Sequence, residues 1–349
     1  MKYKPLGRSG LIVSNLCLGT MVFGEGGPRA ADAATAVNMI HLFLDAGGNF
    51  IDTANVYAEG RSEEIVGKAI KKNRDQVVLA TKVRFPLGEG PNELGLSRYH
   101  ILRSVEDSLN RLQTDTIDLL YMHTWDPLTP VEESLRAFDD LVTAGKVRYI
   151  AVSNFKAWQM MKALSVSDGH GWVRFIAAQY QYSLVERNIE LEFIDLCLSE
   201  GLGIVPWGAI GGGFLSGKYR REERPLDGRL AMMPDDTEES WNRRNLDRNW
   251  RILDVMDDIV TTYDGLAHSQ VALAWLLAQP AVDSVLIGIR TEAQLEDNLR
   301  AAEVQLSSDE LARLDEVSAQ EKGYPYRFLE TYAVRSVSYT HLRAHETND

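Results

Sequence analysis

The sequence predicts an α/β protein, a (β/α)8 barrel that carries an N-terminal β-hairpin and extra C-terminal helices. Eight apolar runs of strand length alternate with helical patterns along the 349 residues. The runs are almost continuously apolar, which is typical of parallel strands that are covered by helices. Because eight parallel strands are the number that closes a barrel, a closed barrel is favoured over an open sheet.

The expected elements follow in order from the N-terminus. Two short strand patterns around Gly7–Gly10 predict a hairpin ahead of the barrel. Gly47, Gly145 and Gly201 stand where helices are expected to end. The barrel strands are predicted at 16–20, 49–53, 77–83, 117–123, 147–154, 176–182, 203–207 and 284–288. Helices are predicted at 32–46, 62–72, 97–112, 130–144, 157–164, 189–199, 268–278 and 292–302.

The interval 218–265 is the main irregularity in this pattern. A charged loop, YRREERPLDGR, precedes an amphipathic helical pattern at 241–263. An insertion between the seventh and eighth strands of a barrel lies beside the active-site mouth. One further helix is predicted at 307–318, packed on the outside of the barrel.

The last residues are predicted to be foreign to the natural protein. The stretch VSYTHLRAHET, 337–347, resembles the in-frame translation of a transposase sequencing adapter, and an ordinary variable tail is the alternative. We therefore expect one domain at 1–335 and a non-native tail at 336–349. His341 and His345 lie in that tail and are given no functional weight.

Composition and charge exclude several classes of partner. The formal net charge of −13 argues against nucleic acid or an anionic membrane surface as a general partner. No run is apolar enough to span a bilayer and the N-terminus carries no apolar targeting pattern, so the cytoplasm is expected. Cys17 and Cys197 lie in apolar runs and are expected to be buried free thiols. The oligomeric state is left open.

Four residues near the ends of consecutive strands form the candidate reaction centre. Asp52 ends the second predicted strand, with Tyr57 five residues later, Lys82 is near the end of the third, and His123 ends the fourth. Catalytic groups of a barrel lie at the C-terminal ends of its strands. A neighbouring Lys82 is expected to lower the pKa of Tyr57 from about 10, which makes Tyr57 a candidate general acid. His123 is expected to donate a hydrogen bond to a carbonyl oxygen.

Each of the four residues has a plainer interpretation when it is taken alone. His123 could be a structural histidine, and Tyr57 could be a loop aromatic that packs. Asp52 could cap the next helix, and Lys82 could be a strand-end lysine or the Schiff-base lysine of an aldolase. Their joint placement favours a reaction centre. The sequence has no nucleophile pattern and no metal-ligand cluster, so we predict no metal; protonation of an oxyanion formed by hydride transfer fits best.

Several long motifs in the same order resemble the aldo-keto reductase superfamily over nearly the whole chain. They are FIDTANVY, ATKV, DLLYMHTWDP, GKVRYIAVSNF, AAQYQYSLVER and PWGAIGGGFLSGKY. The resemblance is closest to the bacterial aryl-alcohol-dehydrogenase-like branch, which also resembles the β subunits of potassium channels. It implies that Asp52, Tyr57, Lys82 and His123 are the catalytic tetrad of the family, with none substituted.

The resemblance also implies NADP(H) as the cofactor, bound without the G-x-G-x-x-G fingerprint, which the chain lacks. Pairing of Arg290 with the 2′-phosphate favours NADP(H) over NAD(H); a solvated arginine at a helix start is the alternative. Residues that correspond to the nicotinamide end are Ser153, Asn154, Gln179 and Trp207, and Thr20 and Asp52 are also expected at the cofactor. Those that correspond to the pyrophosphate loop and the adenosine end are Gly208, Ile210, Gly213, Lys218, Arg229, Gly288, Arg290, Gln294, Asp297 and Asn298.

The pyrophosphate loop departs from the family pattern. Gly208–Ile210 reads Gly-Ala-Ile where relatives usually have Ser-Pro-Leu, so weaker or looser cofactor binding is expected. The run GGFLSGKY nearly matches a P-loop, but Tyr219 replaces the Ser or Thr that binds Mg²⁺. A nucleoside triphosphate site is therefore rejected.

The leading hypothesis is an NADPH-dependent reductase of aldehydes and ketones in which Tyr57 supplies the proton. Phe23 and Trp125, on loops at the barrel mouth, are expected to line the substrate site with Tyr57 and His123; ordinary loop packing is the alternative. A second hypothesis is an NADP(H)-binding redox-sensing or regulatory subunit with slow turnover. A third is a Schiff-base aldolase that uses Lys82. The physiological substrate is left open.

Overall fold

The structure is a computed structural model that describes residues 1–24, 30–221 and 223–333. The chain divides into a compact unit, Met1–Ser318, and a second unit that begins at Ala319. The described part of the second unit contains α13 (Tyr326–Phe328) and the π-helical turn η5 (Leu329–Ala333). The tail at 336–349 lies outside the described residues, and the domain end at 335 stays a prediction.

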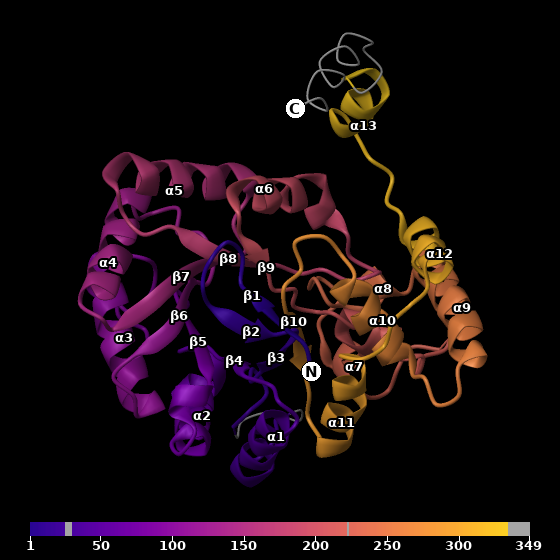
Figure 1. Cartoon of the computed structure of the whole chain (residues 1–349), viewed down its shortest axis with the longest axis horizontal. Helices are drawn as coiled ribbons and strands as arrows, with labels where there is room; N and C mark the ends of the chain where they lie inside the picture. Colours follow the sequence, from indigo (N-terminus) through magenta and orange to yellow (C-terminus); the bar gives the residue numbers. More distant parts are fainter. Residues whose placement is uncertain (25–29, 222, 334–349) are drawn as a thin grey trace, which may run out of the picture. The chain divides into compact units, whose positions relative to one another are not determined.

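The first unit is built on one sheet of eight parallel strands, drawn inside the ring of helices in Figure 1. The sheet closes between its two outer strands, where Asp283 N–H donates to Ile204 O (3.1 Å) and Leu286 N–H donates to Pro206 O (3.0 Å). The predicted (β/α)8 barrel is therefore confirmed. In sheet order the strands are β10 (Val285–Gly288), β3 (Leu16–Gly19), β4 (Phe50–Asp52), β5 (Val78–Val83), β6 (Ile117–Met122), β7 (Val147–Ser153), β8 (Phe175–Gln179) and β9 (Gly203–Ile204).

The predicted hairpin closes the N-terminal end of the barrel. Strands β1 (Tyr3–Pro5) and β2 (Ile12–Ser14) pair antiparallel, and Leu6 and Val13 pack into the barrel interior with Cys17 and Phe50. The turn binds the chain just before β9 and β10, because Arg8 N–H donates to Gly201 O and Gly7 N–H donates to Asp283 Oδ2. The C-terminal ends of the strands are at the opposite rim.

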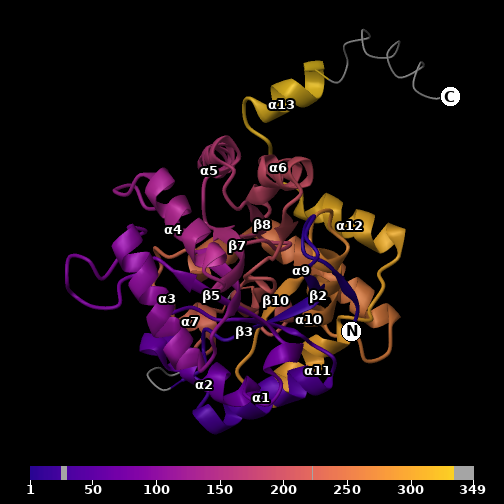
Figure 2. The ribbon, with the colours of Figure 1, turned by 60° about the vertical axis from the view of Figure 1, so that its left-hand side comes forward.

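Helices surround the sheet, and Figure 2 shows α1 to α5 following one another outside the strands. Consecutive helices along the first half of the chain contact one another, as do α1 and α11, so the ring continues past the closure of the sheet. The outer helices are α1 (Ala33–Asp45), α2 (Arg61–Ile70), α3 (Arg98–Leu112), α4 (Val131–Thr143), α5 (Ala157–His170), α6 (Phe193–Glu200), α10 (His268–Leu277), α11 (Glu292–Arg300) and α12 (Ser308–Ser318).

The two thiols and three predicted helix ends are as the sequence indicates. Cys17 and Cys197 are buried and free. Gly47, Gly145 and Gly201 have φ angles of 85°, 74° and 75°, as the ends of α1, α4 and α6 require. In the part of the chain that is described, no helix has the length and apolar character needed to cross a bilayer. The cytoplasmic location stays a prediction.

Three helix predictions are wrong in extent. The helix expected at 157–164 continues to His170, because its stop signal is Gly171, with φ 66°. The helix expected at 189–199 is a 3-10 turn, η3 (Asn188–Leu191), followed by α6. The helix expected at 241–263 is broken into α8 (Trp241–Arg244) and α9 (Asp247–Thr262), and a further short helix, α7 (Arg229–Met232), precedes them.

Local side-chain hydrogen bonds explain the break between α8 and α9. Asn249 Nδ2 donates to Arg244 O (2.9 Å), and Trp250 Nε1 donates to Asn245 Oδ1 (2.7 Å). Asparagine side chains offer the backbone partners outside the helical pattern, so they favour a turn at this point. The amphipathic pattern continues through the break and therefore gave no sign of it.

Candidate active site

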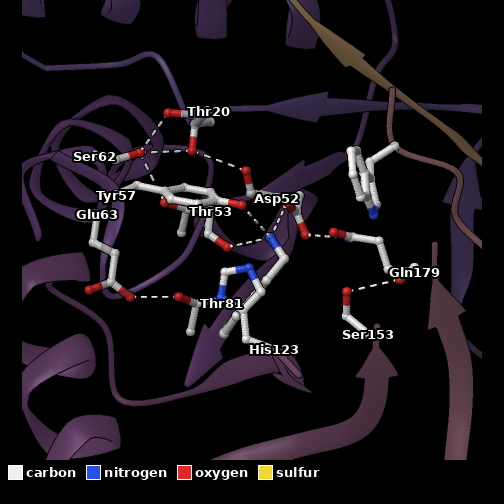
Figure 3. Close-up of polar contacts among 12 residues, drawn as sticks. Thr20, Asp52, Thr53, Tyr57, Ser62, Glu63, Thr81, His123, Ser153 and Gln179 are labelled. Carbon is white, nitrogen blue, oxygen red and sulfur yellow. Dashed lines mark hydrogen bonds and ion pairs between the residues drawn. The ribbon is translucent and has the colours of Figure 1, made fainter. Parts of the chain in front are cut away.

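A buried ion pair lies at the C-terminal rim of the barrel. Asp52 is the last residue of β4, and Lys82 lies one residue before the end of β5. Lys82 Nζ pairs with Asp52 Oδ1 and also donates to the carbonyl oxygen of Thr53 (2.9 Å). Gln179 Nε2 donates to Asp52 Oδ2 (2.9 Å), so both carboxylate oxygens have partners (Figure 3). Burial lowers the pKa of Lys82, but Asp52 and Tyr57 more than offset this and raise it above its usual value.

Tyr57 completes the contact with Lys82. It begins the 3-10 turn η1 (Tyr57–Gly60), in which Ala58, Glu59 and Gly60 all have positive φ (48°, 58° and 91°). This tight turn directs the phenol back over the strand ends, and Lys82 Nζ donates to Tyr57 Oη (3.3 Å). The turn after β4 thus positions a hydroxyl beside the ion pair.

The expectation of a lowered tyrosine pKa is wrong. Burial raises the pKa of Tyr57, Lys82 lowers it, and Asp52 raises it again, with a net rise above the usual value near 10. The Lys82 charge is largely compensated by Asp52, so its effect on the phenol is too small to overcome burial. Tyr57 is therefore a protonated phenol at neutral pH, which is the form that a general acid needs.

His123 lies directly after β6 and faces the same rim. Its ring is 6.0 Å from the Tyr57 ring and 4.6 Å from the Phe85 ring, edge-on to both. The backbone N–H of His123 donates to Val83 O (3.1 Å), and its backbone carbonyl accepts from Asn154 Nδ2 (3.0 Å). Burial lowers the pKa of His123 well below its usual range, and the charges of Lys82 and Arg84 lower it further. The imidazole is therefore neutral and keeps one N–H that can donate.

The depressed pKa of His123 makes the stability of the protein depend on pH. Below about pH 6.5 the unfolded chain protonates this histidine while the folded chain does not, so the free energy of unfolding falls as the pH falls. We expect His123→Asn to reduce the loss of stability between pH 7.5 and pH 5.5 by about 1 kcal/mol. Urea unfolding at both pH values measures this difference, and equal losses in the two proteins would contradict it. The other histidines are unchanged, so they serve as an internal control.

A cluster of hydroxyl groups supports the Asp52 end of β4. Thr20 Oγ1 donates to Asp52 O (3.0 Å), and Ser62 Oγ lies 2.8 Å from Thr20 Oγ1 and 3.0 Å from Thr53 Oγ1. All three side chains are fully buried (Figure 3). The sequence interpretation took Ser62 only as a helix-start signal, but α2 begins at Arg61 and the hydroxyl binds the strand ends instead. The hydroxyl of Thr20, expected at the cofactor, is engaged here.

A second buried carboxylate fixes the strand that carries Lys82. Glu63 accepts from Thr81 Oγ1 (2.6 Å) and from Arg111 Nε (2.7 Å), which ties β5 to α2 and α3. Its side chain is fully buried, so the carboxylate needs both donors. Helix-start acids are usually exposed, and the sequence therefore gave no reason to single out Glu63.

The residues expected at the nicotinamide end are brought together beside Asp52. Ser153 Oγ donates to Gln179 O (2.8 Å), and Asn154 Nδ2 donates to Ser153 Oγ (2.8 Å). Asn154 Oδ1 in turn accepts from Trp207 Nε1 (3.4 Å). Ser153 and Gln179 end β7 and β8, Asn154 follows β7, and Trp207 follows β9, so these side chains form a polar edge next to the ion pair.

The loop after β9 is rich in glycines that adopt left-handed backbone conformations. Gly208, Gly211, Gly212 and Gly213 all have positive φ, between 58° and 92°, within or just before the 3-10 turn η4 (Gly211–Ser216). Each would be strained by a side chain. Lys218 is exposed and its Nζ lies beside Gly213 and Gly228. Ile210 is partly buried.

Arg229 and the residues around it also face this loop. Arg229 pairs with Glu239, and Glu239 Oε1 would lie 3.8 Å and 3.4 Å from a Cβ atom added at Gly208 and Gly212. The Nε atom of Arg229 and the Nε2 atom of Gln181 are buried and have no hydrogen-bond partner among the described residues. Such orphan donors at a glycine-rich turn are what a bound diphosphate would satisfy.

The residues expected at the adenosine end divide into two groups. Arg290 is partly buried, and no carboxylate of the described chain lies within 4.0 Å of it. Its backbone N–H donates to Gln294 Oε1 (2.9 Å), and Gly288 is exposed at the end of β10. Asp297, in contrast, accepts from Ser269 Oγ (2.6 Å) and Gln270 Nε2 (2.7 Å), so it joins α10 to α11, and Asn298 is buried beside it.

The two aromatic residues expected in the substrate wall, Phe23 and Trp125, differ in how deeply they are buried. Phe23 is completely buried in the hydrophobic core, so the alternative of loop packing fits it better. Trp125 is partly buried between Phe155 (5.1 Å between ring centroids) and Trp158 (5.8 Å). Its role at the substrate stays a prediction.

The fold and this rim define a class of protein: a closed (β/α)8 barrel with a phenol, an ammonium, a carboxylate and a neutral imidazole at the C-terminal ends of its strands. Residues 15–319 match the model of the Aldo/keto reductase family. The chain belongs to this family and is an oxidoreductase.

Named relatives are similar along almost their whole lengths. The "uncharacterized oxidoreductase YrpG" of Bacillus subtilis is 39% identical over 328 residues, which cover 91% of this chain and 96% of the relative. A "probable voltage-gated potassium channel subunit beta" of Oryza sativa is 38% identical, with 87% and 92% covered. The "norsolorinic acid reductase stcV" of Emericella nidulans is 37% identical, with 92% and 82% covered. These matches confirm the branch that the motifs indicated.

Proposed function

We propose that this oxidoreductase reduces aldehydes and ketones to alcohols with NADP(H), and that Tyr57 is its general acid. The observation that carries the proposal is the contact of Tyr57 Oη with Lys82 Nζ (3.3 Å), beside the neutral ring of His123. A protonated phenol, a fixed ammonium and a neutral imidazole at one rim suit the delivery of a proton to an oxyanion.

The residues of the rim fit NADP(H). The positive-φ glycines, the orphan donors of Arg229 and Gln181, and the exposed Lys218 suit a diphosphate. Ser153, Asn154 and Gln179 offer amide and hydroxyl groups to the nicotinamide, with Trp207 as the aromatic neighbour. When bound, NADP(H) supplies the hydride that reduces the carbonyl carbon.

The residues of this chain supply the remaining chemistry. Tyr57 gives its phenolic proton to the carbonyl oxygen as negative charge develops there, and water later replaces that proton. Lys82 stabilises the phenolate that remains, while Asp52 keeps Lys82 charged and in position. His123 donates its one N–H to the same oxygen and orients the substrate.

Steady turnover tests the proposal against a second candidate. Relatives named as probable potassium channel β subunits favour the possibility of a regulatory subunit that turns over slowly. With NADPH and a panel of aromatic aldehydes and dicarbonyls, an enzyme gives a continuous loss of absorbance at 340 nm. A single-turnover burst followed by a flat trace would favour the regulatory subunit and overturn the enzymatic proposal.

The preference for the 2′-phosphate is tested at Arg290. We expect Arg290→Ala to weaken NADPH binding by about 10- to 100-fold and NADH binding by less than about 3-fold, because only NADPH offers the phosphate dianion. Fluorescence titration with each cofactor measures both constants. Arg300→Ala, which removes the same charge from the exposed end of α11, is the matched control. Equal losses for the two cofactors would remove Arg290 from this role.

A further inference from the structure

Arg84 is a cation at the catalytic rim that the proposed proton transfer does not use. It is the first residue after β5, two positions beyond Lys82. Its guanidinium lies 5.5 Å from the centre of the Phe85 ring, and Phe85 in turn contacts His123 at 4.6 Å. Gly95 N–H donates to Arg84 O (2.8 Å), which holds the backbone in place. Two rings, Phe85 and His123, thus separate Arg84 from Tyr57 along a chain of three contacts.

The guanidinium has no anionic partner in the described part of the chain. Among the described residues no carboxylate lies within 4.0 Å of it, and its Nε atom is buried with no hydrogen-bond partner there. Arg84 also has a φ of 155°, a backbone conformation that residues with side chains rarely adopt. A buried unpaired donor and an unusual backbone are both costly, and such features persist mainly at functional sites.

Asp126, an acid whose pKa Arg84 helps to lower, is already engaged elsewhere. Asp126 accepts from Leu96 N–H (2.7 Å), Leu128 N–H (3.0 Å) and Thr129 Oγ1 (2.7 Å). The field of Arg84 still reaches Asp126, and it reaches His123 as well, because it contributes to lowering the pKa of both groups. Arg84 therefore acts electrostatically on both the imidazole and the loop after β6, and in the described part of the chain its own charge is not neutralised by an ion pair.

The charges around the carbonyl site leave Arg84 as the cation that can take an anion. Lys82 is neutralised by Asp52, and Arg229, whose field also reaches Tyr57, is paired with Glu239. His123 is neutral. One uncompensated guanidinium suits one negative charge, and its planar fork matches a carboxylate.

We propose that Arg84 binds a carboxylate of the substrate, so that the preferred substrates are aldehydes or ketones that carry a carboxylate beyond the carbonyl. This inference rests on the proposed function, since it assumes that the carbonyl lies at Tyr57. Arg84, Phe85, His123 and Tyr57 contact one another in that order, so the substrate carboxylate lies apart from the carbonyl, and an aryl ring is the spacer used in the test.

The test compares 4-carboxybenzaldehyde with its neutral isostere, 4-carbamoylbenzaldehyde, with NADPH and the whole chain. We expect the wild type to favour the carboxylate in kcat/KM, and Arg84→Gln to lower that selectivity ratio by about 10- to 100-fold, mainly through KM. Arg84→Lys should retain part of the selectivity. Arg103→Gln, which removes the same charge from the exposed face of α3, should leave the ratio unchanged. A ratio that is unaffected by Arg84→Gln would overturn the inference.

A binding measurement separates this inference from the proposed function. Calorimetric titration with benzoate and with benzamide, at saturating NADP⁺, needs no turnover. We expect the wild type to bind benzoate more tightly, and Arg84→Gln to bind the two ligands equally. Equal binding of the two ligands by the wild type would reject the carboxylate subsite even in an active enzyme. Arg84-dependent benzoate binding without any aldehyde reduction would support the subsite and reject the reductase.

Discussion

Tyr57→Phe is expected to lower the rate of carbonyl reduction by about 10²- to 10⁴-fold while NADPH binding stays within about 2-fold. The variant keeps the ring, and with it the edge-on contact with His123, but removes the hydroxyl that Lys82 contacts. Because the phenol is the candidate acid, the loss should be in kcat and should not be recovered by more substrate. Single-turnover kinetics at saturating NADPH measure the chemical step directly.

Tyr99→Phe is the matched control for this prediction. It removes a phenolic hydroxyl from an exposed position on α3, outside the barrel. Its rates should equal those of the wild type. If Tyr57→Phe also retained wild-type rates, Tyr57 would have no part in proton transfer and another donor would have to be sought.

Lys82→Met is expected to lower the free energy of unfolding by about 3–5 kcal/mol and to abolish measurable turnover. The substitution leaves the Asp52 carboxylate buried, with the Gln179 amide as its remaining side-chain donor. An unpaired buried charge costs far more than the ion pair contributes. Urea unfolding gives the stability loss.

The double variant Asp52→Asn/Lys82→Met separates the loss of the ion pair from the cost of leaving the Asp52 charge buried. Because neither remaining group is charged, it should be more stable than Lys82→Met alone, although it should be equally inactive. Arg98→Met breaks the partly exposed pair with Asp140 and should cost no more than about 1 kcal/mol. If the Lys82→Met protein were as stable as the Arg98→Met control, the Asp52 carboxylate left by the substitution would not be a costly buried charge, and the prediction would be wrong.

The barrel could be predicted because its strands are buried on both faces. Each strand is an apolar run, the runs alternate with amphipathic helices, and the hairpin is marked by Gly7 and Gly10. The extents of α5 and of the α8–α9 pair were predicted wrongly. The end of α5 depends on Gly171, which the helical pattern did not single out, and the break between α8 and α9 depends on local side-chain hydrogen bonds of Asn245 and Asn249.

The convergence of the four rim residues could also be predicted, because strand ends of a parallel barrel meet at one edge. The direction of the Tyr57 pKa shift could not be predicted, because burial and Asp52 raise this pKa while Lys82 lowers it. Ser62, Glu63 and Arg84 were missed for a similar reason. Each resembles an ordinary helix-start or loop residue in the sequence, and only burial and the absence or presence of a partner distinguish it.

Transfer of deuterium tests directly whether this chain moves a hydride from NADPH to a carbonyl carbon. NADPH carrying deuterium at C4 of the nicotinamide, prepared separately on each face, is incubated with the wild-type chain and 4-carboxybenzaldehyde. We expect the alcohol product to gain one deuterium at the former carbonyl carbon from one face of the cofactor and none from the other, as read by mass spectrometry. An alcohol without deuterium from either face, or no alcohol at all, would contradict it.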